Sequence, residues 1–405
     1  MKELRRSYLD ELISTIGTED IKVITGIRRA GKSFLLRQFE QHIGANIPDA
    51  NIISINLSST DFEELLEYHA LESYITTHYK EGAHNFVLID EVQMSNGFER
   101  AINSLHASRQ YDIYLTGSNA FLMSSDLATL FTGRTYTIHV FPFSFKEYLA
   151  YHDHPADIEQ AFDSYFYDGG FAGSYSYPTR DQRYKYIREV YDTLILRDIV
   201  KKHKIKNPYT LNAICDFLTD NISKKTSMRS VAKGLNSATS TPVDESWQDT
   251  NHVTAGQYVS YLCEAYTFIK MPRYDIRGKK CLASLEKYYL TDHSFRFARL
   301  GTKVLDYGRI YENIVAVELL RRGYEVYVGS LWDKEVDFVA KKGDEKLYFQ
   351  VSSDITSEET FTREVAPLLA INDAYPKILI ARTRQPEANY EGIRILNLAT
   401  FLSED

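Results

Sequence analysis

The chain has 405 residues, which is too long for one ordinary hydrophobic core and predicts two or three domains. Apolar residues make up 44% of it and charged residues 25%, as in a soluble globular protein. The net charge of −8 argues against a surface built throughout for nucleic acid. The charged N-terminus does not resemble a signal peptide, and no apolar run approaches the ~18 residues that a membrane span needs. We therefore expect a cytoplasmic protein that makes no membrane contact.

Residues 21–25, IKVIT, form an apolar run of strand type that ends in a glycine-containing loop. The loop has the spacing G-x-x-x-x-G-K-[ST], and a helical pattern begins directly after it. Its glycines let backbone N–H groups approach phosphate oxygens, and the start of the helix adds a favourable dipole. The candidate nucleotide-binding residues are Gly26, Ile27, Arg28, Arg29, Ala30, Gly31, Lys32, Ser33 and Phe34.

Two of these side chains have predicted roles in binding ATP or ADP. Lys32 is expected to bridge the outer two phosphates as a point charge, and Ser33 is expected to place its hydroxyl on Mg²⁺. A chance glycine turn is the alternative, which the strand before the loop, the helix after it and the GKS ending disfavour. The loop therefore predicts a nucleotide site with ATP or ADP and Mg²⁺ as cofactors.

Strand and helix patterns alternate over the first 150 residues, which predicts an α/β fold. Continuous apolar strands separated by helices indicate a parallel sheet covered on both faces, with its ligand site at the carboxyl ends of the strands. We expect strands at 21–25, 51–57, 86–90, 111–116 and 135–140. We expect helices after Ser33 and at 61–79, 98–109 and 119–131.

The strand at 86–90 ends in Asp90 and is followed by Glu91, the acidic pair that a phosphate-binding loop requires. Asp90 is expected to hold Mg²⁺, and Glu91 is expected to polarise the attacking water as a general base. Two carboxylates at an exposed strand end are the alternative, which the neighbouring loop disfavours. A kinase of small substrates does not usually need a glutamate directly after the magnesium aspartate, so Glu91 favours hydrolysis.

Two further residues are candidates for the catalytic machinery. Asn119, with Ser118 in reserve, follows the strand at 111–116 and is predicted to orient the water, although a helix N-cap is an equal alternative. Arg134 precedes the last strand and is predicted to neutralise transition-state charge, in cis or toward a neighbouring subunit. A plain surface role for Arg134 is equally compatible with the sequence. If Arg134 acts toward a neighbouring subunit, the protein is an oligomer, and the sequence leaves this possibility open.

Several segments, in this order and spacing, resemble the AAA+-type ATPases of a large, poorly characterised prokaryotic family. They are GIRRAGKS, FVLIDEVQ, LTGSNAFLMS, FTGR, FPFSFKEYLAY and the double-glycine turn YDGGF at 167–171. In that family the ATPase domain is followed by a conserved domain of unknown function. The resemblance implies an ATPase with the phosphate loop, the acidic pair and Asn119 in the roles given above. It implies no known cellular role.

Helical spacing dominates residues 151–222, which are expected to form a lid on the nucleotide domain. Within residues 223–300, expected helices at 227–235 and 253–269 precede two strand-like runs around the basic turn RGKK. Two helices and a basic hairpin predict a winged helix-turn-helix. The resembled family also has one here.

Duplex DNA and a protein are both open as partners of this segment. Residues 201–280 carry 13 Lys and Arg against 7 Asp and Glu, a surplus of six that suits a polyanion. Against DNA stand the long connection at 236–252, its acidic residues, and a second helix whose main candidate for base readout is Gln257. A winged helix used for protein packing is at least as well supported by the sequence.

Residues 301–405 resemble the PD-(D/E)XK nuclease fold in their order of helices and strands. That chemistry needs an aspartate and a glutamate on adjacent strands to hold Mg²⁺, and a lysine two positions after the glutamate. Asp337 and Glu312 match two acidic positions, but Gln350 and Ser352 stand where the glutamate and the lysine are needed. We therefore expect a nuclease-like domain without cleavage activity, used for binding or assembly.

Asp337 has two possible roles in such a domain, metal binding and a structural role. With Glu312 and Asp337 alone, metal affinity falls sharply, because one charged ligand is missing. A structural role for Asp337, capping or pairing with Lys334 or Lys346, is favoured over metal binding. An ATP-gated nuclease is therefore the least favoured function.

The sequence supports two main hypotheses of different classes. The first is Mg²⁺-dependent ATP binding and hydrolysis, coupled to a conformational change or to a partner. The second is a slow nucleotide-dependent switch or scaffold that retains ADP and turns over little. The predicted domains are a P-loop AAA+-like domain at 1–150, a helical lid at 151–222, a winged-helix-like domain at 223–300 and a nuclease-like α/β domain at 301–405.

Overall fold

The computed structural model describes residues 5–117, 131, 133–238, 250–303, 305–332 and 334–404. Its contacts divide into two compact units, unit 1 (Met1–Pro142) and unit 2 (Phe143–Asp405). Among the helices of the described ranges, none combines the length and the apolar character that a bilayer crossing requires.

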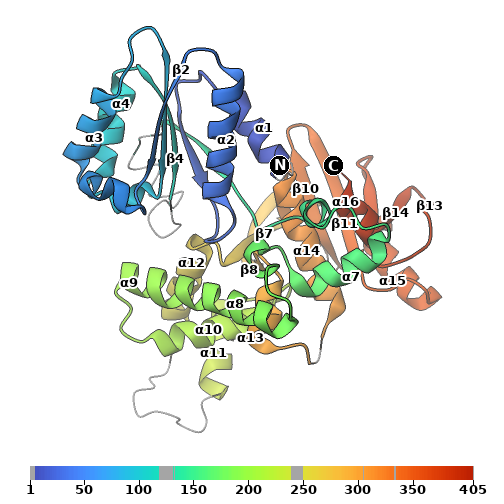
Figure 1. Cartoon of the computed structure of the whole chain (residues 1–405). Helices are drawn as coiled ribbons and strands as arrows, with labels where there is room; N and C mark the ends of the chain where they lie inside the picture. The colour runs from blue at the N-terminus through green and yellow to red at the C-terminus, as the bar shows by residue number, and fades with distance from the viewer. Residues whose placement is uncertain are drawn as a thin grey trace. The chain divides into compact units, whose positions relative to one another are not determined.

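Unit 1 is built on a parallel sheet that has, in the described residues, five strands in the order β2-β3-β4-β1-β5 (Figure 1). The strands are β1 Ile21–Thr25, β2 Ala50–Asn56, β3 His84–Asp90, β4 Tyr111–Thr116 and β5 Thr135–His139. In β1, Val23 lies opposite Leu115 on one side and Thr137 on the other. The predicted parallel α/β sheet is confirmed, because each strand lies where the apolar pattern placed it.

Helices cover both faces of this sheet, with α2 on one face and α3 and α4 on the other (Figure 1). The helix predicted at 61–79 is broken, because Glu67 is extended between a 3-10 turn and α3. The helix predicted at 119–131 falls outside the described residues apart from residue 131. The helical elements are α1 Arg6–Ser14, α2 Lys32–Asn46, η1 Thr60–Leu65, α3 Tyr68–Thr77, η2 Val92–Met94 and α4 Phe98–Ala107.

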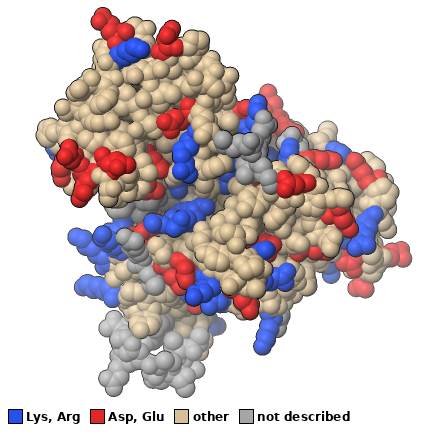
Figure 2. Space-filling view, in the orientation of Figure 1, with Lys and Arg blue, Asp and Glu red and all other residues tan. Residues whose placement is uncertain are grey.

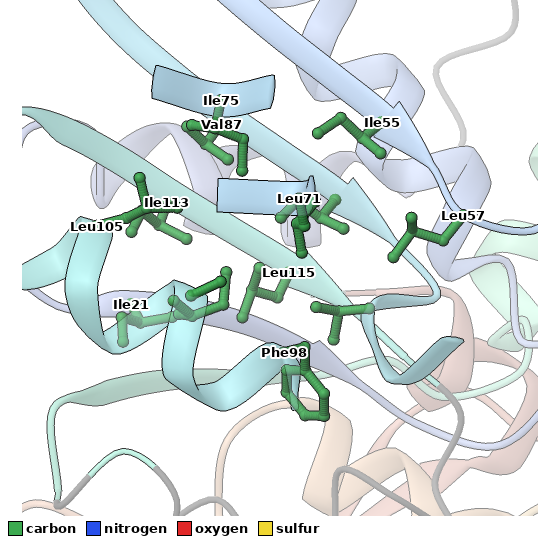
Figure 3. Close-up of a cluster of buried hydrophobic side chains, with 14 of the residues drawn as sticks. Ile21, Ile55, Leu57, Leu71, Ile75, Val87, Phe98, Leu105, Ile113 and Leu115 are labelled. Carbon is green, nitrogen blue, oxygen red and sulfur yellow. The ribbon is translucent and has the colours of Figure 1, made fainter. Parts of the chain in front are cut away.

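A buried apolar cluster holds α3 and α4 against the strands (Figure 3). Leu71 and Ile75 of α3 and Leu105 of α4 pack with Val87 and Ile113 of the sheet. Burying one such side chain contributes about 1.5–3 kcal/mol. The cluster therefore fixes the strands whose carboxyl ends carry the polar residues of interest.

The first part of unit 2 is helical, as predicted for residues 151–222. Capping side chains set the starts of its helices: Ser144 and Thr179 each form a capping box, and Asn207 caps α10. The role of this segment as a lid stays a prediction. Its elements are α6 Phe145–Tyr151, α7 Ile158–Asp168, η3 Ala172–Ser174, α8 Arg180–Asp192, a π-helix at Thr193–Ile199, α9 Val200–His203 and α10 Pro208–Asp220.

A small module of helices and a hairpin follows α10. The helix predicted at 253–269 ends earlier, at Glu264, because Tyr266 is left-handed with φ 55° and Phe268 begins a strand. The acidic residues expected between its two helices, Asp244, Glu245 and Asp249, lie outside the described ranges. The elements are β6 Lys225–Thr226, α11 Met228–Ala238, α12 His252–Glu264, β7 Phe268–Asp275, β8 Lys280–Leu290 and α13 Ser294–Leu300.

The hairpin β7-β8 continues into the sheet of the C-terminal strands. The described part of unit 2 has nine strands in the order β13-β14-β12-β11-β10-β9-β7-β8-β6. The junction is the parallel pair of β7 and β9, in which Arg273 lies opposite Val328. The sequence did not predict this pairing. The remaining elements are α14 Tyr307–Arg321, β9 Glu325–Leu331, β10 Lys334–Lys342, β11 Glu345–Ser352, α15 Glu358–Leu369, β12 Lys377–Ala381, β13 Ala388–Tyr390, β14 Ile393–Asn397 and α16 Leu398–Ser403.

Candidate functional site

The loop with the phosphate-binding spacing connects β1 to α2 at the carboxyl edge of the sheet. Gly26 has φ 135°, and a Cβ on it would lie 2.1 Å from the carbonyl oxygen of Val140, so only glycine fits there. Gly31 has φ 94° and occupies the N-cap position of α2. The loop thus leads backbone N–H groups to a helix start, the geometry that receives anions.

The Lys32 side chain is folded back into this loop and is only 6% exposed. Its Nζ donates to the carbonyl oxygens of Gly26 at 2.8 Å and Ile27 at 3.2 Å. Neutral carbonyls compensate a buried ammonium less well than an anion does, because charge-assisted hydrogen bonds between ions are stronger. The loop therefore offers a desolvated cation that fits a phosphate group.

Ser33, Asp90 and Thr116 come together where α2, β3 and β4 meet. Ser33 Oγ donates to Asp90 Oδ1 at 3.0 Å, and Thr116 Oγ1 donates to the same oxygen. A hydroxyl and a carboxylate oxygen suit Mg²⁺, which binds few protein ligands and keeps several waters. The structure thus brings the two predicted metal ligands together. Thr116 was not predicted, and its only sequence signal is its place at the end of a strand.

Glu91 follows β3 in a left-handed conformation, with φ 57°. Its backbone N–H donates to Thr116 Oγ1 at 3.2 Å, and its carboxylate accepts a hydrogen bond from Gln93 Nε2. A non-glycine residue at positive φ stores strain, which is common at sites where a side chain must point in a set direction. Thr116 and Gln93 together therefore fix the position of the Glu91 carboxylate.

The other two predicted catalytic residues have different outcomes. Asn119 and its alternative Ser118 lie outside the described residues. Arg134 is exposed and precedes β5, and its carbonyl accepts a hydrogen bond from the backbone N–H of Ile21, the first residue of β1. Arg134 is therefore at the amino edge of the sheet, about 16 Å of strand away from the loop. A role in cis does not fit this place, whereas the role toward a neighbouring subunit and the plain surface role both stay open.

The remaining loop residues differ in exposure: Ile27 and Ala30 are buried, Arg28 and Phe34 are partly buried, and Arg29 is exposed with φ 65°. Residues that the sequence did not single out surround the loop. Arg5, at the start of α1, is 2% exposed and donates to the carbonyl oxygens of Ala30 and, at 2.8 Å, Phe141. Arg5 therefore holds the loop at the Ala30 carbonyl and ties it to the backbone after β5.

His139, the last residue of β5, lies beside the loop. Its Nδ1 is 3.3 Å from Thr25 Oγ1. Burial, and then the positive charge of Lys32, lower the pKa of His139 to about 4. The imidazole is therefore neutral in the folded protein at pH 7.

The low pKa of His139 predicts a loss of stability in acid. As the pH falls from about 6.5 to about 4, the unfolded chain binds a proton that the folded protein does not yet bind, so the free energy of unfolding decreases over this window and levels off below it. We expect His139→Gln to flatten this decrease. Thermal unfolding midpoints at several pH values check it, with the exposed His69→Gln as matched control. Equal acid sensitivity in wild type and His139→Gln would contradict the assignment.

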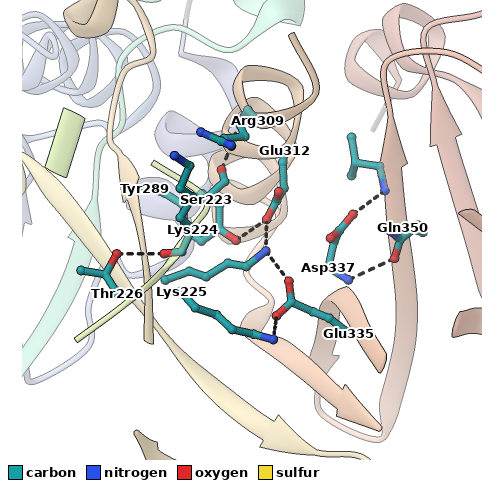
Figure 4. Close-up of polar contacts among 12 residues, drawn as sticks. Ser223, Lys224, Lys225, Thr226, Tyr289, Arg309, Glu312, Glu335, Asp337 and Gln350 are labelled. Atoms are coloured by element: carbon teal, nitrogen blue, oxygen red, sulfur yellow. Dashed lines mark hydrogen bonds and ion pairs between the residues drawn. The ribbon is translucent and has the colours of Figure 1, made fainter. Parts of the chain in front are cut away.

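A second polar cluster lies in unit 2, where Glu312, Asp337 and Gln350 are all buried (Figure 4). Asp337 Oδ2 accepts a hydrogen bond from the backbone N–H of Val351 at 2.8 Å. Gln350 Oε1 accepts from the backbone N–H of Asp337 at 3.3 Å, and Gln350 Nε2 donates to Glu364 at 3.1 Å. Burial, and then the charge of Glu312, raise the pKa of Asp337 well above its usual range.

The expected pairing of Asp337 with Lys334 or Lys346 is wrong. Lys346 instead forms an ion pair with Asp373 at 3.3 Å, and the hydrogen bond that Asp337 accepts comes from the backbone of β11. The expected capping role is closer, because the carboxylate satisfies a buried N–H group. Ser352, at the position where the expected nuclease pattern needs a lysine, donates to the carbonyl oxygen of Asp354 at 2.8 Å.

Two residues that the sequence did not single out complete this cluster, Lys287 on β8 and Glu335 on β10. Lys287 Nζ lies 2.8 Å from Glu312 Oε1 and 2.8 Å from Glu335 Oε1. Tyr289 donates to Glu312 Oε1 at 2.7 Å. No spacing in the sequence signals these contacts, because Lys287, Glu312 and Glu335 are more than 20 residues apart and come together only in the folded protein.

Two solved structures are similar to this chain at a low level. The ORC1 protein of Aeropyrum pernix in complex with DNA is 10% identical, with 78% of this chain and 94% of that chain covered and a TM-score of 0.29. AMPPCP-bound DnaA from Aquifex aeolicus is 14% identical, with 64% of this chain and 88% of that chain covered and a TM-score of 0.32.

Two family models and two related proteins match the amino-acid sequence. A family model described as "AAA domain" matches residues 18–149, and one described as a domain of unknown function (DUF8612) matches residues 159–306. An uncharacterized protein of Haemophilus influenzae is 35% identical over 407 residues, which cover 98% of each chain. The uncharacterized protein MJ1544 of Methanocaldococcus jannaschii is 26% identical over 365 residues, covering 85% of this chain and 77% of that protein. The chain therefore belongs to the family of the Haemophilus influenzae protein, and its residues 18–149 match an AAA domain.

Proposed function

We propose that unit 1 binds ATP with Mg²⁺ and hydrolyses it, and that turnover drives a conformational change in the chain or in a partner. The observation that carries this proposal is the contact of Ser33 Oγ with Asp90 Oδ1 at 3.0 Å, beside a loop that holds the buried Lys32 ammonium. Lys32 and the N–H groups of the loop would hold the outer phosphates, and Ser33 and Asp90 would hold the ion. Mg²⁺, when bound, neutralises negative charge on the phosphates.

Hydrolysis also needs an activated and oriented water. We assign Glu91 as the general base, because it follows Asp90 at the carboxyl edge and its backbone is anchored on Thr116. We assign Asn119 to orienting the water, and Arg134 to the transition-state charge at the site of a neighbouring subunit. The test is calorimetric titration with ATP and ADP, followed by measurement of Mg²⁺-dependent phosphate release. A folded protein that takes up neither nucleotide would contradict the proposal.

A slow switch is the second candidate function, and the hydrogen bond from Gln93 to the Glu91 carboxylate favours it. A carboxylate already engaged in this bond is a weaker base for water until the bond opens. In this case the nucleotide state, and not the number of turnovers, is the output of the protein. Turnover near zero with tightly retained ADP would identify the switch, whereas steady release of phosphate would identify the ATPase.

We propose that the module from α10 to β8 is a winged helix. The order α10-β6-α11-α12-β7-β8 and the pairing β6-β8-β7 support it. Its hairpin is paired with β9, and the exposed face of α12 is uncharged around Val253 and Gln257. These two features favour packing within unit 2 over insertion of α12 into a DNA groove.

Basic side chains next to the winged helix nevertheless suit a polyanionic partner. Figure 2 shows Lys and Arg gathered around the position of α9. Lys201, Lys204 and Lys206 are exposed there, and His203 stacks on Tyr261 of α12 with ring centroids 3.6 Å apart. We propose duplex DNA as this partner, held through its phosphates and without base readout.

Charge reversal tests the basic surface around α9. We expect Lys201→Glu combined with Lys204→Glu to weaken binding of a duplex oligonucleotide by about tenfold or more. Each lysine that neutralises a phosphate releases condensed counterions from the DNA, and the variant loses this contribution to affinity. Fluorescence anisotropy at several salt concentrations measures this loss and a flatter salt dependence. Lys334→Glu with Lys342→Glu, two exposed residues of β10, is the matched control. No binding by the wild type at low salt would exclude DNA and favour a protein partner.

We propose that the C-terminal part of unit 2 is a nuclease-like domain of the PD-(D/E)XK type that does not cleave. The order α14-β9-β10-β11-α15-β12 supports the outline. Gln350 and Ser352 are neither acidic nor basic, and both are engaged in hydrogen bonds of their own. A metal ion would lack a charged ligand and water would lack its lysine, so the domain serves binding or assembly.

A further inference from the structure

We propose that the Lys287 ammonium is a tethered cation that takes the place of a metal ion among three carboxylates and closes them to divalent ions. We define the carboxylate cluster as Glu312 of α14 together with Glu335 and Asp337 of β10. This cluster lies in unit 2 and is independent of the nucleotide function proposed for unit 1. Through it, Lys287 joins β8 to α14 and β10.

The contacts of Lys287 are those of a buried ion and not of a surface side chain. Its side chain is 4% exposed, and its Nζ lies 2.8 Å from one oxygen of Glu312 and 2.8 Å from one oxygen of Glu335. Tyr289, on the same face of β8, donates to the same Glu312 oxygen (Figure 4). One ammonium therefore bridges carboxylates from two different elements, as a bound cation does.

Two ammonium groups compensate two of the three carboxylates without a metal ion. Lys287 and Lys225 face Glu312 and Glu335, so that two positive groups meet two negative ones. Asp337 accepts a hydrogen bond from a backbone N–H of β11, and its burial raises its pKa well above the usual range, which favours the neutral carboxyl. A divalent ion added here would leave excess positive charge in a buried place, which is unfavourable.

The geometry of the acidic side chains agrees with a closed cluster. In the part of the chain that the structure describes, no group of three or more His, Cys, Asp and Glu residues is arranged to hold a metal ion. A divalent ion needs several oxygen ligands directed at one point. In the cluster, the carboxylates of Glu312 and Glu335 are both directed at the Nζ atom of Lys287.

Removal of the ammonium tests the proposal in the full-length protein without nucleotide. Lys287→Met keeps the length of the side chain but leaves buried carboxylates without a cation, so we expect the unfolding midpoint in EDTA to fall by about 10 °C. Millimolar Mn²⁺ should then restore a large part of this loss, because the ion fills the vacated place. Wild type should show no Mn²⁺ shift beyond the one that Asp337→Asn also shows at the same ionic strength.

Two controls separate the cluster from other effects. Lys225→Met makes the same chemical change against Glu335, but the Lys225 side chain is 40% exposed, so its midpoint should fall little and not respond to Mn²⁺. Lys287→Met combined with Asp337→Asn should lose the recovery by Mn²⁺. Binding of Mn²⁺ near Asp90 in unit 1 is common to all these proteins and cancels in the comparison.

Several outcomes would overturn the proposal. One is stabilisation of wild type by Mn²⁺ that Asp337→Asn abolishes, because the cluster would then be a metal site already. Another is a Lys287→Met protein that is as stable as wild type in EDTA. If Lys287→Met does not fold, Lys287→Arg and a plasmid assay decide. The closed cluster is supported if Lys287→Arg is as stable as wild type and if wild type shows no Mn²⁺-dependent cleavage. Cleavage by wild type that disappears in Asp337→Ala contradicts it.

Discussion

The Lys32→Ala protein should remain folded and bind neither ATP nor ADP, with an affinity loss of at least about 100-fold. Lys32 is the cation of the loop, held in place by the carbonyl oxygens of Gly26 and Ile27. Phosphates that replace these carbonyls as acceptors would gain charge-assisted hydrogen bonds, and the alanine variant cannot supply them. The fold should tolerate the change, because it removes a buried charge and not an apolar contact.

Isothermal titration calorimetry with ATP and ADP, with and without Mg²⁺, measures this loss, and thermal unfolding confirms the fold. Lys80→Ala is the matched control. Lys80 is exposed and precedes β3, at the edge of the sheet opposite to the loop, so it should leave affinity unchanged. Retained nucleotide binding in Lys32→Ala would show that the loop is not the phosphate site.

The Glu91→Gln protein should bind ATP as wild type does but release phosphate about 10²–10⁴ times more slowly. The amide is close in shape to the carboxylate and can keep a hydrogen bond with Gln93, but it cannot accept a proton from the attacking water. Ser33 and Asp90 remain in place, so the proposed ion site is intact. Binding and chemistry should therefore separate in this variant.

Single-turnover phosphate release, measured beside calorimetric affinity, resolves the two steps. Glu81→Gln is the matched control, because Glu81 is exposed in the turn before β3, away from the carboxyl edge. Full turnover in Glu91→Gln would refute the role as general base. Turnover equally close to zero in wild type and variant would support the switch instead.

Much of unit 1 could be predicted from the sequence. Apolar strands such as β1 and β3 have continuous runs that only a sheet covered on both faces accommodates, and the structure confirms them. The sequence also placed Ser33 and Asp90 at the same edge, because parallel strands have their carboxyl ends together. Their contact at 3.0 Å follows from that rule.

Predictions that depended on an element's surroundings were less successful. The helix expected at 253–269 ends at Glu264. The prediction was too long because the apolar pattern continues into β7, and periodicity does not separate a buried helix end from a buried strand. Arg134 was placed by its order along the chain, but strand pairing puts it beside Ile21 at the amino edge. Sequence order alone does not tell which edge of a sheet a residue occupies.

The sequence by itself determined the loop with the phosphate-binding spacing, the adjacent acidic pair and the uncharged Gln350 and Ser352, because these signals are carried by residues within a few positions of each other. Only the tertiary structure decided that Thr116 bonds Asp90 and that Lys287 bridges Glu312 and Glu335. These partners lie far apart in sequence. Their contacts exist only once strand order and register have formed, and no local spacing encodes them.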